Sequence, residues 1–122
     1  MNKWKKFYEN NNGNNFPNSI LISFFYNEFI KIKKKFYVLD LGCGLGSSLR
    51  LTNKKNFIFD LVDISEKALK IINSNKDFKN KNFQTFNKNF CEFLESSKKK
   101  YDLIIDSASL QHQHKKDFIK SF

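Results

Sequence analysis

The chain has 122 residues, 40% of them hydrophobic and 15 of them Phe, which suits one domain with a packed core and excludes a globally disordered chain. Its formal net charge is +10, from 22 Lys and Arg against 12 Asp and Glu. Such a charge would suit an anionic partner, but Lys, Asn, Phe and Ile are abundant together, which is more typical of a biased genome than of a binding surface.

The cysteines and the apolar segments argue against an exported or membrane protein. Cys43 and Cys91 lie far apart and in no metal-ligand spacing, which favours free thiols in a reducing compartment over a disulfide framework or a zinc site. The N-terminus has no secretory h-region, and the longest apolar run, ILISFFYNEFI, is too short to span a bilayer. We therefore expect a cytoplasmic protein with no metal and no membrane partner.

Residues 1–35 are expected to form an N-terminal segment with one helix, ahead of a core at residues 36–122. Asn18 or Ser19 can cap the helix, which is expected to end at the lysine cluster 33–35. One apolar stripe recurs at helical spacing. It consists of Ile22, Phe25, Phe29 and Ile32.

From residue 36 the chain alternates between strand and helix patterns. Four apolar runs predict strands: Phe36–Leu41, Asn56–Asp63, Asn82–Phe86 and Tyr101–Ser107. Helical patterns follow them at Ser47–Asn53, after a cap at Ser65, at Phe90–Ser96 and from Lys115 onward. Such alternation with short links predicts parallel βαβ units, that is, an α/β fold whose strands are covered on both faces.

The lysines fall into clusters that each precede an expected strand. They lie at 33–35, at 54 and 55, at 79 and 81, and at 98–100. The N-terminal ends of parallel strands share one edge of the sheet, whereas ligands of such sheets bind at the C-terminal edge. We therefore expect most of the positive charge to form a solvated face and not a substrate groove.

The C-terminal edge of the sheet is expected to carry the residues that could contact a ligand. In the sequence LDLGCGLGSS, Gly42, Gly44 and Gly46 permit positive φ angles and close approach of a ligand to the backbone. Asp63 ends the second strand roughly 20 residues later, where an acid can accept hydrogen bonds from both hydroxyls of a ribose.

The glycine turn departs from the dinucleotide fingerprint G-x-G-x-x-G. Its third glycine comes one residue early, and Ser47 stands in the usual place. Asp40, just before the first glycine, would repel a pyrophosphate and suits a cationic or amine-bearing ligand better. A nicotinamide-dependent oxidoreductase remains an alternative because of Asp63, but the glycine spacing opposes it.

These residues carry a resemblance to a known family. VLDLGCGLGSS followed by LVDIS resembles motif I and the acidic loop after it in class I S-adenosylmethionine-dependent methyltransferases. NKNFCEFL and YDLIIDSASLQH match the family's adenine-contact loop and fourth strand more loosely. The resemblance implies a Rossmann-like three-layer sandwich with strand order 3-2-1-4.

The resemblance also implies a set of contacts with S-adenosylmethionine. The glycine turn would lie against the methionine part, Asp40 would hold its amino group directly or through water, and Asp63 would bind the ribose. Ile64 and Phe90 would border the adenine, Asn89 would read its amino group, and Asp106 would lie near the methionine end. The full set is Asp40, Gly42, Cys43, Gly44, Gly46, Asp63, Ile64, Asn89, Phe90 and Asp106. Cys43 occupies a variable position and is expected to be a small buried residue.

Two departures from the family pattern stand out. Leu61 replaces a common glycine before the ribose-binding acid. The fifth to seventh strands of the family are absent, since the chain stops in the helix after strand four. Strand four is then an exposed edge, so we expect an incomplete sequence, a homo-oligomer through that edge or completion by a partner chain.

The sulfonium methyl is already activated, so transfer needs mainly a well-placed acceptor, and a base only for a weakly acidic hydroxyl. His112 is the candidate base; the alternative is that it is an exposed loop histidine without a catalytic role. His114 is not expected to form a metal-binding pair with it.

Trp4 and Tyr8 belong either to a segment that folds over the cofactor or to a helix that packs on the domain. The stretch DSASLQH, with no NPPY-type motif, favours a small-molecule acceptor such as a sugar or metabolite hydroxyl or amine. A truncated non-catalytic domain and an RNA methyltransferase remain alternatives.

Overall fold

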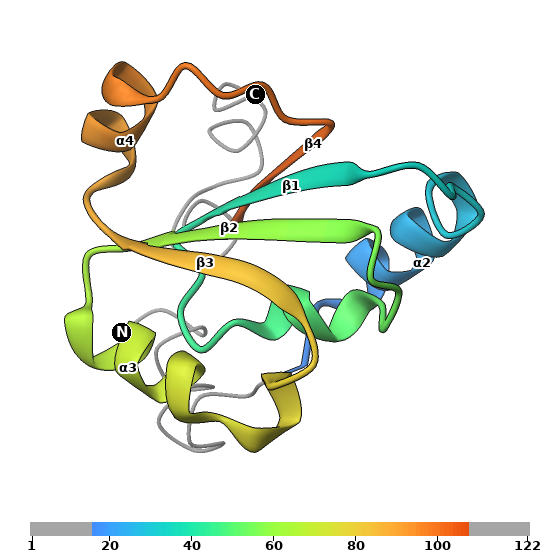
Figure 1. The fold of residues 1–122 in the computed structure, drawn as a ribbon, viewed down its shortest axis with the longest axis horizontal. Helices are drawn as coiled ribbons and strands as arrows, with labels where there is room; N and C mark the ends of the chain where they lie inside the picture. The colour runs from blue at the N-terminus through green and yellow to red at the C-terminus, as the bar shows by residue number, and fades with distance from the viewer. Residues whose placement is uncertain (1–15, 108–122) are drawn as a thin grey trace.

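The computed structural model describes residues 16–107, which form an α/β fold (Figure 1). The elements in chain order are α2 (Ser19–Glu28), β1 (Phe36–Leu41), η1 (Ser47–Leu51), β2 (Phe57–Asp63), α3 (Glu66–Ser74), η2 (Lys76–Phe78), β3 (Asn82–Asn87), α4 (Phe90–Ser96) and β4 (Leu103–Asp106). The two short elements η1 and η2 are 3-10 helices. Trp4, Tyr8, His112, His114 and the helix expected from Lys115 lie outside the described residues.

The four strands form one parallel sheet in the order β3-β2-β1-β4, as predicted. Val38 of β1 is opposite Phe59 of β2 on one side and Leu103 of β4 on the other. Among the described strands, β3 and β4 are therefore the two edges. All strands point the same way, so their C-terminal ends meet at one edge of the sheet.

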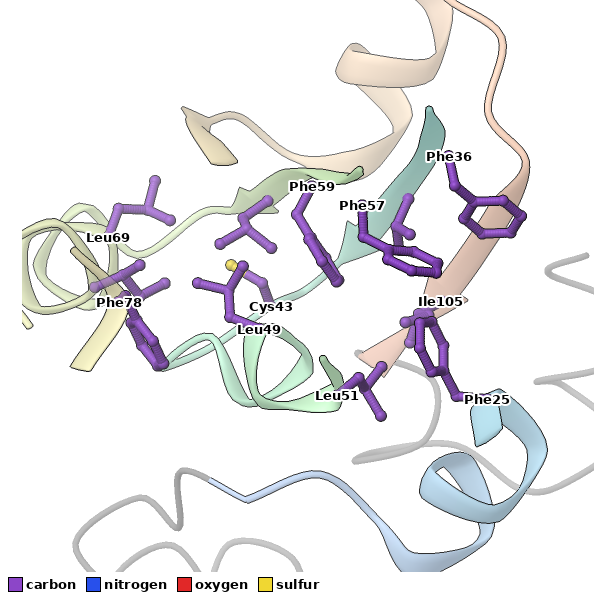
Figure 2. Packing of buried hydrophobic residues seen from close by; sticks show 13 residues of the cluster. Phe25, Phe36, Cys43, Leu49, Leu51, Phe57, Phe59, Leu69, Phe78 and Ile105 are labelled. Carbon is purple, nitrogen blue, oxygen red and sulfur yellow. The ribbon is translucent and has the colours of Figure 1, made fainter. Parts of the chain in front are cut away.

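The sheet lies between two layers of helices (Figure 1). Successive side chains of a strand point to opposite faces, so β1 sends Val38 to one buried cluster and Leu39 to another. The larger cluster joins the sheet to α2, η1, α3 and η2 (Figure 2). Within it the ring of Phe57 packs on those of Phe25 and Phe36, at 5.1 and 5.3 Å between centroids. The smaller cluster lies under α4, which contributes Phe93. This arrangement is the three-layer sandwich expected from the sequence.

Local capping agrees with the sequence in both places where it was predicted. The Asn18 side chain accepts a hydrogen bond from the Ile20 N–H at 2.7 Å. The Ser65 hydroxyl accepts one from the Ala68 N–H at 3.1 Å. Both caps satisfy main-chain donors that the first turn of a helix leaves free.

The helix α2 ends earlier than expected, at Glu28 instead of the lysine cluster. Phe29 leaves the helical conformation, with φ −124° and ψ −20°, and its ring packs on that of Phe36 at 5.0 Å between centroids. The predicted stripe still faces the core, because Phe25 is buried and Ile22, Phe29 and Ile32 pack against the main cluster. Tertiary packing of Phe29 thus replaces the last expected turn.

Two further boundaries and one burial pattern differ from the prediction. The segment after the glycine turn is a 3-10 helix that stops at Leu51, and Thr52 is already extended. The strand β4 begins only at Leu103, because Asp102 is used in a link to Tyr37: its N–H donates to the Tyr37 carbonyl and its carboxylate accepts the Tyr37 N–H, both at 2.8 Å. The edge strand β3 has no fully buried residue, so the expectation of complete cover on both faces was wrong for it.

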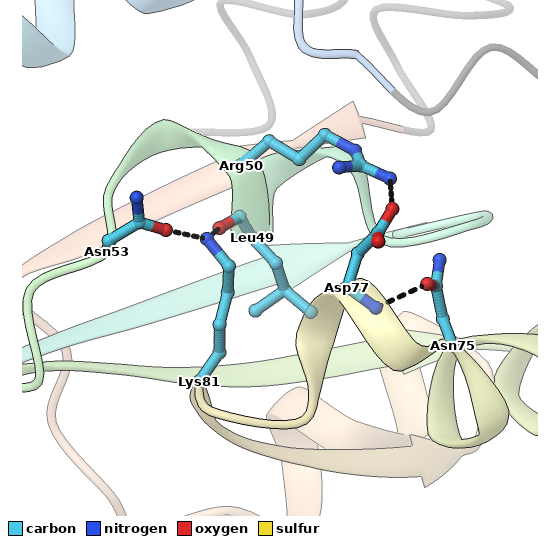
Figure 3. Close-up of polar contacts among 6 residues, drawn as sticks. All are labelled: Leu49, Arg50, Asn53, Asn75, Asp77 and Lys81. Atoms are coloured by element: carbon cyan, nitrogen blue, oxygen red, sulfur yellow. Dashed lines mark hydrogen bonds and ion pairs between the residues drawn. The ribbon is translucent and has the colours of Figure 1, made fainter.

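The lysines that precede the strands are exposed, as expected, with the exception of Lys81, which is half-buried. Lys81 donates to the Leu49 carbonyl at 2.6 Å and to the Asn53 side chain at 2.9 Å (Figure 3). It also donates to the Thr52 carbonyl at 2.9 Å. Burial lowers the pKa of Lys81, and the charge of Arg50 lowers it further. This ammonium group therefore satisfies the carbonyls that end η1, in place of the cap residue that the segment lacks.

Candidate functional site

The C-terminal ends of β1, β2 and β3 bring several predicted site residues to one edge of the sheet. The glycine turn follows β1, Asp63 and Ile64 follow each other at the end of β2, and Asn89 and Phe90 lie just beyond β3. Asp106 ends β4, opposite Leu41 of β1. The topology therefore places the whole predicted set, except His112, along the edge where parallel sheets bind ligands.

The glycine turn adopts the left-handed backbone conformation at all three glycines, with φ of 74° at Gly42, 56° at Gly44 and 79° at Gly46. The main-chain N–H groups of Gly42 and Cys43 both donate to the Val62 carbonyl, at 2.8 and 3.0 Å. These two hydrogen bonds fold the turn back over the end of β2. The conformation is one that side chains disfavour, which explains the residue choice.

Gly46 has a second requirement, which comes from packing and not from a ligand. A Cβ atom at this position would lie 3.2 Å from Cγ1 of Ile72 in α3 and 3.5 Å from the ring of Phe78. The turn thus needs a glycine here to let α3 and η2 approach η1.

Asp63 joins the turn to the loop after β2. Its Oδ2 accepts a hydrogen bond from the Gly44 N–H at 2.8 Å, and its Oδ1 accepts one from the Ser65 N–H at 2.8 Å. A carboxylate has about four lone-pair positions, so each oxygen can still accept a hydroxyl group. The side chain is only partly buried, which leaves it reachable for a ligand at this edge.

Asp40 is fully buried beneath the turn. Its Oδ2 accepts the Ser48 hydroxyl and its Oδ1 the Ser107 hydroxyl, each at 2.6 Å. Burial raises the pKa of Asp40 to about 6, the two hydroxyls act in the opposite direction, and the charges of Asp63 and Asp106 add to the rise. The edge is therefore an electronegative site in which a bound cation would be favoured.

Two large apolar side chains are exposed beside these acids. Ile64 is 75% exposed and Phe90 is 43% exposed, whereas most large apolar residues of the sheet are buried. Their positions are those expected to border an adenine ring. Asn89, expected to read the adenine amino group, caps α4: its Oδ1 accepts the Glu92 N–H at 3.0 Å.

Cys43 points its side chain away from the ligand edge. It is 3% exposed and belongs to the main hydrophobic cluster (Figure 2), which confirms the expectation of a small buried residue. Burial raises the pKa of its thiol well above the usual range, and the charge of Asp40 adds to the rise. Contact of Cys43 with a ligand would involve its backbone.

Sequence reasoning missed three polar residues that organise this edge. Ser48 and Ser107 hold the two oxygens of Asp40, and Asn87 donates to the carbonyls of Asp63 and Ile64. The sequence signal was weak, because a serine after a glycine turn or after a strand has many roles. The clearest sequence indication was for Asn87, because an asparagine that ends a strand at the ligand edge can donate hydrogen bonds to the neighbouring loop.

A buried acid in the middle of β2 was also missed. Asp60 is 2% exposed, and its Oδ2 accepts hydrogen bonds from the Lys99 ammonium at 2.9 Å and the Tyr101 hydroxyl at 2.6 Å. The Asp60 Oδ1 has no hydrogen-bond partner within residues 16–107. Burial raises the pKa of Tyr101, and the hydrogen bond to Asp60 raises it further. This group ties the segment before β4 to the sheet and lies on the α4 side, so it is structural.

Residues 16–107 hold no group of three or more His, Cys, Asp and Glu side chains that could bind a metal ion. None of the helices in this range is long and apolar enough to cross a membrane.

The chain was compared with known proteins. No curated protein gives a significant match. A family model described as a methyltransferase domain matches residues 38–122, which is well over half of the chain and includes β2, β3, β4 and all of β1 from Val38 onward. The parallel order β3-β2-β1-β4 is the order expected for that domain. The chain therefore belongs to the class I S-adenosylmethionine-dependent methyltransferase family.

Proposed function

We propose that this chain binds S-adenosylmethionine at the C-terminal edge of β1, β2 and β3 and transfers its methyl group to a small-molecule acceptor. The observation that supports this most directly is the 2.8 Å hydrogen bond from the Gly44 N–H to Asp63. It joins the two sequence features of the family, the glycine turn and the acid after β2, in one preorganised unit. Preorganisation lowers the cost of ordering the site when a ligand binds.

The charge and the shape of the edge suit this cofactor. S-adenosylmethionine carries a sulfonium and an ammonium group, and the edge holds three aspartates, Asp40, Asp63 and Asp106, of which the last two contribute charge that raises the pKa of Asp40. The free lone pairs of Asp63 can accept ribose hydroxyls, and exposed Ile64 offers an apolar surface to the adenine. The negatively charged pyrophosphate of a dinucleotide would be repelled by the same acids.

The chain contributes binding and orientation, whereas the cofactor supplies an already activated methyl group. The glycine turn would hold the methionine part and Asp63 the ribose, so that the methyl group faces the end of β4. An acceptor that is a weakly acidic hydroxyl would need a base, for which His112 is the candidate from sequence. A small-molecule acceptor rests on the sequence pattern after β4.

RNA is a weaker alternative acceptor, because it rests on net charge. Several of the lysines that carry this charge are used inside the protein: Lys54, Lys55 and Lys81 donate to main-chain carbonyls of Ile30, Asn80 and Leu49 respectively. Their ammonium groups are less available to phosphates than the sequence suggests. Filter binding to RNA with a flat salt dependence would exclude it, since phosphate contacts release counterions.

Titration calorimetry with S-adenosylhomocysteine tests the cofactor proposal. We expect saturable binding by the wild-type chain and a loss of at least tenfold in affinity for Asp63→Ala, because hydrogen bonds to a charged group are worth about 1.5–3 kcal/mol. Asp77→Ala is the matched control, since Asp77 is an exposed aspartate whose partner is Arg50. No binding by a folded wild-type sample, or an equal loss in both variants, would contradict the proposal.

Methyl transfer is tested separately from binding. A folded chain that binds the cofactor is incubated with labelled methyl donor and with pools of small metabolites or of RNA. We expect label in small molecules and none in RNA. Label in RNA alone would replace the acceptor part of the proposal and leave the cofactor part intact.

A further inference from the structure

The hydrogen bonds of Asp40 have a fixed direction. A carboxylate can only accept, so the hydroxyls of Ser48 and Ser107 must both be donors toward it. Both O···O distances are 2.6 Å, which is within the short range typical of a hydroxyl bound to an ionised carboxylate. Each serine has thus used its only hydrogen.

The two serines differ in what else they can reach. Ser48 belongs to η1 and is 1% exposed, so it holds Asp40 from the core side. Ser107 follows the last residue of β4 and is partly exposed. Asp40 itself is 0% exposed. Within the described residues, the negative charge of Asp40 therefore reaches the ligand edge through the Ser107 hydroxyl.

A hydroxyl that gives its hydrogen to a carboxylate presents only lone pairs on its other side. Such a group accepts hydrogen bonds and cannot donate one. It favours an ammonium group and disfavours a carboxylate, because the buried negative charge lies directly behind it. Ser107 is consequently a selective receptor for the cationic end of a ligand.

We propose that Ser107 binds the amino group of the methionine part of the cofactor, and that Asp40 is the positioning residue that fixes the direction of the Ser107 hydroxyl. This inference rests on the proposed cofactor. It replaces a direct or water-mediated contact of Asp40 with a contact through a side chain. It also orients the amino-acid part, with its ammonium toward Ser107 and its carboxylate away from Asp40.

The surrounding charges act in the same direction. The titratable groups whose charges act on Asp40 are Asp63 and Asp106, and both disfavour its ionised form; the charge of Asp40 acts in turn on the buried thiol of Cys43. Asp63 is engaged by the Gly44 and Ser65 N–H groups. An ammonium at Ser107 would relieve the repulsion among these acids.

The test compares two probes that differ only at the relevant end. S-adenosylhomocysteine has the amino-acid part, and 5′-methylthioadenosine lacks it. By calorimetry at pH 8, we expect Ser107→Ala to weaken binding of S-adenosylhomocysteine by on the order of tenfold, and binding of 5′-methylthioadenosine by less than about twofold. Ser107→Thr, which keeps the hydroxyl, should restore most of the affinity.

Ser74→Ala is the matched control, because it removes an exposed hydroxyl that donates to the Lys70 carbonyl within α3, away from Asp40. It should leave the ratio of the two affinities unchanged. An equal loss for both probes in Ser107→Ala, or no loss at all, would overturn the inference while wild-type binding upholds the proposed cofactor. A folded wild type that binds neither probe would overturn both.

If Ser107→Ala does not fold, the pH dependence of binding by the wild type tests the same inference. The affinity for S-adenosylhomocysteine should fall below pH 6, by up to about tenfold per pH unit, because Asp40 then takes up a proton. The affinity for 5′-methylthioadenosine should stay flat across that range. Parallel pH profiles for the two probes would contradict the inference.

Discussion

Asn87 holds the position of Ile64 through its side-chain amide, which donates to the Ile64 carbonyl at 3.1 Å. The same amide nitrogen donates to the Asp63 carbonyl at 3.2 Å. One side chain at the end of β3 thus fixes the backbone of the two residues at the end of β2 that are expected to hold the adenosine part. The loop after β2 is therefore shaped by its neighbouring strand.

Replacing Asn87 with alanine should loosen this loop. We expect a loss of about 1 kcal/mol in the free energy of unfolding, together with several-fold weaker binding of adenosine-containing ligands. Urea denaturation and calorimetry measure the two effects. Asn82→Ala is the control, because Asn82 begins the same strand at the opposite edge and donates to Lys55; equal binding losses in both variants would contradict the role of Asn87.

Ile64→Ala should change binding but not stability. Ile64 is 75% exposed, and substitutions at such surface positions usually change stability by less than about 0.5 kcal/mol. Loss of an apolar contact with the adenine should lower the affinity for S-adenosylhomocysteine by roughly fivefold or more. Ile20, which is 78% exposed on α2, gives a matched control; an Ile20→Ala variant with the same loss of affinity would disprove a specific role for Ile64.

Gly46→Ala should destabilise the fold through two separable causes. The φ of 79° costs about 1–2 kcal/mol for a residue with a side chain, and the new methyl group would lie 3.2 Å from Ile72. Chemical denaturation measures the total. Adding Ile72→Val should recover only a part of the loss, since it removes the δ-methyl at 3.3 Å but keeps Cγ1 at 3.2 Å and the backbone strain; complete recovery would contradict a contribution from the backbone strain.

Tyr101→Phe should weaken the attachment of the segment before β4. The Tyr101 hydroxyl donates to the buried Asp60 at 2.6 Å, and removing a hydrogen bond to a charged acceptor costs about 1.5–3 kcal/mol. The matched control is Tyr26→Phe, because Tyr26 is 55% exposed. Thermal denaturation at neutral pH should separate the two variants clearly.

The contribution of Tyr101 should also depend on pH. Its pKa is raised in the folded protein, so the folded state holds the phenol proton more tightly than the unfolded chain, whose tyrosines titrate near pH 10. The stabilisation is complete below about pH 10 and is lost as the pH rises through the higher folded pKa. The difference in stability between wild type and Tyr101→Phe should therefore shrink above pH 10. A constant difference would contradict this assignment.

Asp40 predicts a pH effect at the acidic end. Its pKa of about 6 in the folded protein lies above the ordinary value of 3.8, so the folded state binds more protons than the unfolded chain between these values. Stability from Asp40 is thus complete below about pH 3.8 and is lost as the pH rises through 6. Relative to Asp40→Asn, wild type should gain about 1 kcal/mol when the pH falls from 7 to 5. If the free energies of unfolding of wild type and Asp40→Asn changed equally between pH 7 and pH 5, the raised pKa of Asp40 would be contradicted.

The architecture of the sheet was readable from the sequence because local signals agree with one another. FYVLDL and FIFDLVD are apolar runs bounded by turn residues, and Ser65 caps the next helix. Parallel strands with helical links allow few topologies, so the position of the glycine turn and Asp63 at one edge followed directly. The residue types themselves pointed to a cationic ligand with a ribose.

The polar organisation of the site was not readable, because it depends on contacts between residues far apart in the chain. Asp40 and Ser107 are separated by 67 positions, and Asn87 and Ile64 by 23. No local pattern indicates which hydroxyl or amide will meet which acceptor. The end of α2 and the role of Lys81 could not be predicted for the same reason. The first depends on packing of Phe29 on the ring of Phe36, and the second on hydrogen bonds to carbonyls at the end of η1.

The position of β4 beside β1 has a consequence for how the chain is made. Tyr37 and Asp102 are bonded across 65 positions of sequence, so one side of β1 has no partner until the ribosome has produced the segment around residue 103. Pairing over such a distance is slow compared with local structure. During synthesis the apolar edge of β1 is open to other chains, and chaperone dependence of the nascent protein should end once β4 emerges.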